Sequence, residues 1–191
     1  MIEAATRLVR EGASPSVTEV ADAASVSRAT AYRYFPTQES LLAEVIVPEL
    51  EAALAAEALP EGLKERFGTA FTTMWSSYIE HEAAYRTILR RGLERPLGES
   101  IEHEEQAGSI RAGRRVRWLR NALAPARERM DEESFEQLVA AMCLFVGIES
   151  LVVLRDVCGL EAKEAEEVAQ WAALALLRAG INEGSEDPVG G

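Results

Sequence analysis

The chain has 191 residues, enough for one or two domains with a sizeable hydrophobic core. Hydrophobic residues make up 48% of it, which excludes an intrinsically disordered chain. The formal net charge of −12 argues against a strongly basic nucleic-acid binder, so the distribution of charge matters more than its sum.

The hydrophobic spacing predicts nine helices and no strand. The predicted helices cover residues 1–11, 17–24, 27–34, 37–57, 63–81, 82–92, 110–129, 132–158 and 161–180. Pro48 either kinks the fourth helix or starts a new one, and Pro125 can interrupt the seventh. Residues 99–107 can form an acidic helical turn. We expect a disordered tail over 182–191, because Gly, Glu and Asp dominate it.

Residues 16–34 carry the signals of a helix-turn-helix. Ser16 with Glu19 three residues later forms a capping box, and Ser27 is a second N-cap. Two short helices joined by a tight turn can place the second helix in the DNA major groove. Its hydrogen-bond donors are Ser27, Arg28, Thr30, Tyr32, Arg33 and Tyr34. The alternative is a capped helical hairpin without a role in DNA binding.

The order of residues around this motif is specific in combination. It comprises a first helix with an apolar face, Glu11-Gly12, Val20-Ala21, Val26-Ser27, Thr30, Tyr32, Phe35-Pro36, and Glu39 before Leu41-Leu42. Over the first 45 residues the chain resembles the TetR/AcrR family of transcriptional regulators. The resemblance implies an all-α fold with a helix-turn-helix domain at 1–47 and a helical ligand-binding and dimerisation domain at 48–181. It implies DNA contacts by Thr18, Ser27, Arg28, Ala29, Thr30, Tyr32, Arg33 and Tyr34.

Several residues depart from the family pattern. Ser25 replaces the glycine of the turn. In the second helix of the motif, Ala29 replaces a glycine, and Ala31 replaces the leucine that precedes the tyrosine at position 32. Gln38 stands where a lysine usually follows, which removes an expected phosphate contact. Residues 1–47 hold four arginines against six acidic residues, a net charge of 4 − 6 = −2. We therefore expect weak, salt-sensitive affinity for non-specific DNA.

The last two predicted helices indicate a dimer. From Leu138 to Leu154 only Glu149 and Ser150 are strongly polar, and a helix apolar all round must be buried all round. The alanine-rich ninth helix allows close approach, so two such helices from each subunit can form a four-helix interface. The predicted interface residues are Met142, Phe145, Val146, Val153, Val168, Trp171, Ala172 and Ala175. The alternative is a helix buried within a monomer.

Aromatic residues gather in the middle of the chain. In TetR/AcrR-like proteins this region encloses a small-molecule pocket, so the resemblance implies an effector site. The candidate ligand-binding residues are Phe71, Trp75, Tyr78 and Trp118. Their aromatic character favours an apolar or aromatic effector, and the polar groups of the tryptophans and the tyrosine need partners when buried. The alternative is that these side chains belong to the hydrophobic core and bind no ligand.

The sequence offers no catalytic or metal site. His81 and His103 lack Cys or His partners at metal-ligand spacing, and neither a phosphate loop nor a nucleophile elbow occurs. We predict no enzyme activity, no cofactor and no metal. Cys143 and Cys158 lie 15 residues apart on one predicted helix, about 22 Å, too far for a disulfide.

This cysteine spacing fits a reduced, cytoplasmic setting. We expect no signal peptide, because no charged segment followed by an apolar core opens the chain. The longest apolar run, 138–148, is too short to span a bilayer, so no membrane partner is expected.

These features lead to one expected function and two alternatives. We expect a homodimeric, ligand-responsive transcriptional regulator, a repressor rather than an activator, that binds a near-palindromic operator on double-stranded DNA. The first alternative is a TetR-like dimeric ligand-binding or interaction protein with weak or lost DNA binding. The second is a small helical enzyme, which the missing catalytic residues disfavour. Salt-dependent binding to the promoter of its own or an adjacent gene would distinguish the expected regulator from the first alternative.

Overall fold

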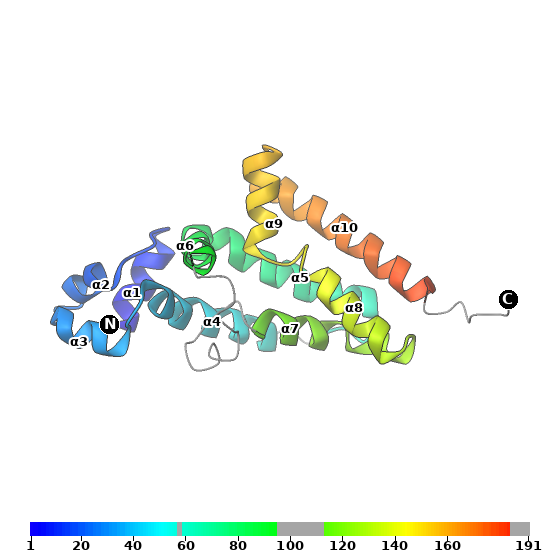
Figure 1. The fold of residues 1–191 in the computed structure, drawn as a ribbon, viewed down its shortest axis with the longest axis horizontal. Coiled ribbons are helices and arrows are strands. Elements are labelled where there is room, and N and C mark those ends of the chain that lie inside the picture. The colour runs from blue at the N-terminus through cyan, green and yellow to red at the C-terminus, as the bar shows by residue number, and fades with distance from the viewer. Residues whose placement is uncertain (57–58, 95–112, 184–191) are drawn as a thin grey trace. The chain divides into compact units, whose positions relative to one another are not determined.

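The structure, a computed structural model, describes residues 1–56, 59–94 and 113–183. In these ranges the fold is all-helical, as expected (Figure 1). The α-helices are α1 (Ile2–Arg10), α2 (Val17–Ala23), α3 (Arg28–Tyr34), α4 (Gln38–Ala56), α5 (Leu63–Glu80), α6 (Glu82–Leu93), α7 (Arg114–Ala122), α8 (Glu132–Met142), α9 (Ile148–Val152) and α10 (Ala162–Glu183). A 3-10 helix, η2 (Ala124–Glu128), follows α7, and a π-helix, η3 (Val153–Val157), follows α9. No helix in the described ranges is long and apolar enough to cross a membrane.

The backbone contacts divide the chain into two compact units. The first comprises Met1–Ala55 and Ser76–Ala112, and the second comprises Ala56–Trp75 and Gly113–Gly191. Helix α5 contributes to both units. The domain boundary expected between residues 47 and 48 stays a prediction. The expected acidic turn at 99–107 lies outside the described residues, as do residues 184–191 of the tail expected to be disordered over 182–191. At Asn182 and Glu183 that expectation is wrong, because α10 continues to Glu183.

The N-terminal helices follow the local signals of the sequence closely. Ser16 Oγ accepts the amide of Glu19 at 3.2 Å, and Glu19 Oε2 accepts the amide of Ser16 at 2.7 Å, so the capping box is confirmed. The Ser16 amide lowers the pKa of the Glu19 carboxyl. Ser27 Oγ accepts the amide of Thr30 at 3.2 Å and begins α3.

Proline has a different effect in two predicted helices. Helix α4 continues through Pro48, so the alternative in which Pro48 starts a new helix is wrong. Pro48 and Glu44 are both exposed, so water can reach the Glu44 carbonyl that Pro48 leaves without an amide partner. By contrast, Pro125 interrupts the seventh predicted helix, where α7 ends and η2 begins. Residues 110–112 of that predicted helix lie outside the described part of the chain.

The single helix predicted over 132–158 is wrong. Helix α8 ends at Met142, and α9 begins only at Ile148, after an extended Gly147 with φ 169° and ψ 163° (Figure 1). Because Cys143 and Cys158 do not share a helix, the distance of 22 Å expected between them does not apply. Both cysteines are free thiols, and partial burial raises the pKa of Cys143.

Side chains from elsewhere explain why the helix can break at this point. Arg115 Nη1 donates to the carbonyl oxygen of Cys143 at 3.3 Å, and Ser150 Oγ donates to that of Leu144. Trp75 Nε1 donates to the carbonyl oxygen of Phe145 at 3.0 Å. Three consecutive carbonyls at the end of α8 thus have side-chain donors, which removes the cost of leaving them unpaired. We refer to this segment, residues 143–147, as the capped break.

The turn between α2 and α3 contains a strained serine. Ser25 has φ +54°, the left-handed conformation that glycine adopts without cost. Its amide bonds to the Asp22 carbonyl at 3.2 Å, and that of Val26 to the Ala21 carbonyl at 2.9 Å. These two bonds form a Schellman motif with serine at the position where glycine is preferred. Ser25 thus replaces the family-typical glycine at a position where the backbone conformation favours glycine.

We predict that Ser25→Gly raises the free energy of unfolding by about 1 kcal/mol, because glycine relieves the positive φ. Urea denaturation measures the change. Ala24→Gly is the matched control, since Ala24 has φ −92° and gains no such relief. That variant should lose up to about 1 kcal/mol. Equal or lower stability of Ser25→Gly than of the unchanged chain would contradict the strain argument.

Candidate nucleic-acid interface and associated sites

Helix α3 has one buried anchor and an exposed polar face. Ala31 is fully buried, as are Val20 and Ala21 of α2, and α2 packs against α3. On the other side the side chains of Arg28, Ala29, Tyr32 and Arg33 are exposed, and Tyr34 is exposed at the last position of the helix. Tyr34 is 66% exposed and Tyr32 is 48% exposed, although both carry large rings. An exposed row of arginine and tyrosine side chains on a short helix suits contact with phosphates and base edges.

Local hydrogen bonds order part of this face. Thr18 Oγ1 and Tyr32 OH lie 3.3 Å apart, which joins α2 to α3. Ser27 Oγ donates to Thr30 Oγ1 at 2.9 Å in addition to accepting the Thr30 amide. Ser27 therefore positions the start of α3, while Tyr32 presents its ring edge and hydroxyl outward. The structure thus brings together all eight predicted DNA-binding residues on α2, α3 and the cap between them.

The charged side chains on the exposed face of α3 are only weakly paired. Arg28 Nη2 lies 3.6 Å from Asp22 Oδ2, but both side chains are more than 60% exposed, so the pair is weak and can open toward a phosphate. The guanidinium of Arg33 lies 5.3 Å from the Tyr34 ring centroid, at the distance of a cation–π contact. Gln38 Nε2 donates inward, to the Ser14 carbonyl at 2.9 Å. Gln38 thus stabilises the fold of residues 1–47, which we call the head, in keeping with the expected loss of a phosphate contact.

A chain of polar contacts links α1 to α4 and to the start of α6 within the first unit. Arg10 on the exposed end of α1 pairs with Glu49 of α4. Glu49 Oε2 also lies 3.3 Å from Nε2 of His81, which is 5% exposed. Sequence reasoning considered His81 only as a metal ligand, because nothing in the local sequence pairs it with Glu49. No cluster able to hold a metal ion occurs among the described residues.

The predicted effector residues do not share one environment. Phe71 and Trp75 are fully buried in the second unit and stack with ring centroids 5.7 Å apart. Tyr78 belongs to the first unit, where it meets the edge of Tyr85 at 4.9 Å. Trp118 on α7 is half-buried. The ring nitrogen of Trp75 already has its partner in the capped break, so its polar group is satisfied without a ligand. The effector assignment stays a prediction.

The predicted interface residues fall into two groups. Met142 and Val146 are fully buried within the chain. Val153, Val168 and Trp171 are exposed, and Phe145, Ala172 and Ala175 are half-buried.

The sequence analysis missed two further exposed side chains beside this surface. They are Leu144, 72% exposed, and Val157, 79% exposed. A groove of about 490 Å³ lies between the capped break and α10, with Leu144, Val153 and Val168 among its walls. We call the exposed set Leu144, Val153, Val157, Val168 and Trp171 the apolar face.

The comparisons with known proteins support this description. Residues 1–45 match the model of the bacterial regulatory proteins, tetR family. Among solved structures, the fold is similar to the crystal structure of a TetR transcriptional regulator from Rhodococcus sp. RHA1. The two chains are 21% identical, the similarity covers 92% of each, and the TM-score is 0.63. No curated protein matches the chain.

Proposed function

Because this chain belongs to the TetR family of bacterial regulatory proteins, we propose that it is a homodimeric, ligand-responsive transcriptional repressor. The observation that carries the proposal is the exposed row on α3, in which Arg28, Tyr32, Arg33 and Tyr34 reach solvent and make only local polar or ring contacts. Duplex DNA supplies the matching acceptors on phosphates and base edges.

The apolar face supports the dimer. Its five side chains are large, they lie on the capped break, η3 and α10, and all are more than 40% exposed. A contiguous exposed apolar surface of this kind marks an interaction site. A second copy of the chain fits best, because a two-fold dimer pairs the same face with itself. Such a dimer would bind two half-sites related by the same axis, which favours a near-palindromic operator.

The effector is proposed to act on the core of the second unit. A ligand can shift the protein only if it binds one conformation of the dimer better than the other. Helix α5 carries Phe71 and Trp75 in the second unit and continues into the first, where Arg10, Glu49 and His81 tie α1, α4 and α6 together. An apolar or aromatic ligand that displaces these rings would therefore act on α5, the helix that contributes to both units.

One observation favours the alternative of a TetR-like dimer with weak DNA binding. Gln38 uses its amide inside the head, and residues 1–47 carry a net charge of 4 − 6 = −2. Non-specific DNA affinity depends on the number of phosphates that basic side chains neutralise. Weak binding should therefore show as a shallow dependence on salt. A specific operator is still compatible with these facts, because base contacts need only a few well-placed side chains.

We predict that Arg28→Ala and Tyr32→Ala each weaken binding to the operator upstream of the chain's own gene by about 1–3 kcal/mol. The reason is that each removes a donor from α3 without touching its buried anchor. Gel-shift titration at two salt concentrations measures the affinity, and circular dichroism checks the fold. Arg91→Ala on α6 is the charge-matched control and should bind like the unchanged chain. Unchanged affinity in both α3 variants would contradict the DNA-binding assignment.

We predict a homodimer at micromolar concentration that buries at least about 2,000 Å², as obligate interfaces do. Trp171→Asp should convert it to a folded monomer, because a carboxylate cannot be buried there without a partner. Light scattering measures the mass. Leu93→Asp is the control, since Leu93 is equally exposed but lies on α6, outside the apolar face. A monomer before substitution, or an intact dimer after Trp171→Asp, would refute the proposed interface.

We predict that an apolar or aromatic effector quenches tryptophan fluorescence and weakens operator binding over the same concentration range. Trp75→Phe and Phe71→Leu, both in the core of the second unit, should blunt the loss of operator binding and leave binding without ligand intact. Trp171→Phe should respond normally, because Trp171 lies on the apolar face. A normal response in both of the first two variants would place the effector site elsewhere.

A further inference from the structure

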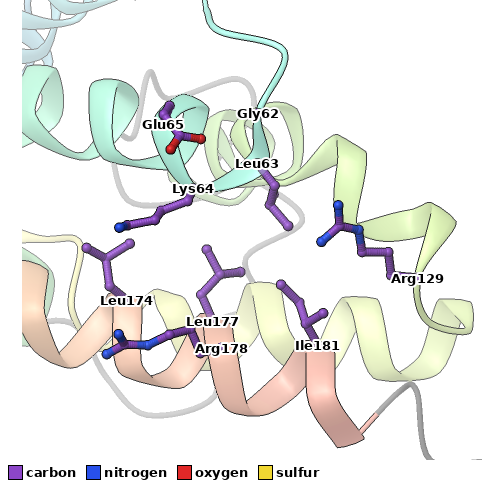
Figure 2. A pocket seen from close by; sticks show the side chains of 9 residues that line it. All are labelled: Gly62, Leu63, Lys64, Glu65, Arg129, Leu174, Leu177, Arg178 and Ile181. Carbon is purple, nitrogen blue, oxygen red and sulfur yellow. The ribbon is translucent and has the colours of Figure 1, made fainter.

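A second, smaller cavity lies away from the aromatic core of the second unit. Its volume is about 270 Å³, and it opens between the first turn of α5 and the last turns of α10. Four apolar side chains form its interior: Leu63, Leu174, Leu177 and Ile181. Leu177 and Leu63 are buried, at 2% and 6% exposure. Figure 2 shows Leu63 from α5 facing Leu177 and Ile181 from α10.

The rim of this cavity is cationic. Lys64, Arg129 and Arg178 line it, and all three are exposed. Among the described residues, none of the three forms an ion pair, whereas Arg115, Arg120 and Arg127 each pair with a glutamate. Three positive charges on separate elements thus surround an apolar interior without a counter-charge from the described chain (Figure 2).

The one carboxylate of the rim is directed elsewhere. Glu65 lies in the first turn of α5, where a carboxylate is stabilised by the positive end of the helix dipole. It folds over Gly62, so closely that a Cβ on Gly62 would lie 2.4 Å from Glu65 Oε2. Glu65 therefore serves the start of α5 and leaves the three cations to another anion.

We propose that this cavity binds a small amphipathic anion, a carboxylate with a short apolar chain. The cationic rim would hold the head group by charge-assisted hydrogen bonds, and the four apolar side chains would cover the chain. At about 30 Å³ for each non-hydrogen atom, the volume suits a ligand of about nine such atoms. A medium-chain fatty acid such as octanoate has this size. The site is distinct from the aromatic core to which the effector is assigned, and its ligand does not depend on DNA binding.

Isothermal titration calorimetry of the full chain with octanoate tests the proposal, with octanol and octylammonium as neutral and cationic analogues. We expect one octanoate for each chain, with octanol bound at least about fivefold more weakly and octylammonium not bound. Lys64→Gln and Arg178→Gln should each weaken octanoate binding by about threefold to tenfold, because each removes one charge from the rim. Arg91→Gln removes the same charge from α6 and should leave the affinity unchanged.

Both rim side chains are exposed, so their substitution should leave the circular dichroism spectrum and the melting temperature unchanged. Three results would overturn the proposal: no binding of octanoate, octanol bound as tightly as octanoate, or unaltered affinity in both folded rim variants. The last result would mean that octanoate binds elsewhere, for example in the aromatic core. None of these measurements uses DNA, so their failure would leave the proposed regulator untouched.

Discussion

The architecture of the second unit depends on the capped break, where three consecutive carbonyls each receive a side-chain donor. A helix that ends inside a protein leaves its last carbonyls unpaired, at a cost of about 1–3 kcal/mol for each one that is buried. Arg115, Ser150 and Trp75 supply the missing bonds from α7, α9 and α5. The chain can therefore change direction before α9, and the new direction leaves Leu144, Val153 and Val157 exposed. The three polar contacts at the capped break thus allow the chain direction that leaves these apolar side chains exposed.

The first unit is stabilised differently, by short-range contacts close in sequence. Its two caps, at Ser16 and Ser27, use residues only three positions apart. The strain at Ser25 is local as well, since two backbone bonds of a Schellman motif hold the left-handed turn. Long-range contacts enter at Glu49, which lies within hydrogen-bonding or ion-pair distance of both Arg10 and His81, and at Ser14, whose hydroxyl donates to Thr87 of α6 at 2.7 Å. The N-terminal helices thus begin and end by local contacts and are joined to α4 and α6 by polar contacts.

The α3 row, the apolar face and the cavity beside α10 each suit a different kind of partner. The α3 row is polar and cationic, which suits a nucleic acid. The apolar face is large and uncharged, which suits another protein surface. The cavity beside α10 combines an apolar interior with a cationic rim, which suits a small amphipathic anion. The α3 row belongs to the first unit, whereas the apolar face and the cavity use different residues of α10 in the second unit. The three features therefore involve different side chains and can bind different partners.

By itself, the sequence determined the parts of this protein that depend on neighbours in the chain. The helix-turn-helix and its caps follow from capping signals and helical spacing, which act over three or four residues. The eight residues expected to contact DNA were implied by the family resemblance and stay a prediction. The all-helical fold follows from the same periodicity. The end of α8 could not be predicted, because residues 132–158 read as one apolar helix and the donors that break it come from Trp75 and Arg115, far along the chain. The pairing of Glu49 with His81 and the cationic cavity were likewise decided by tertiary structure, since only packing brings α5 and α10 to the same cavity.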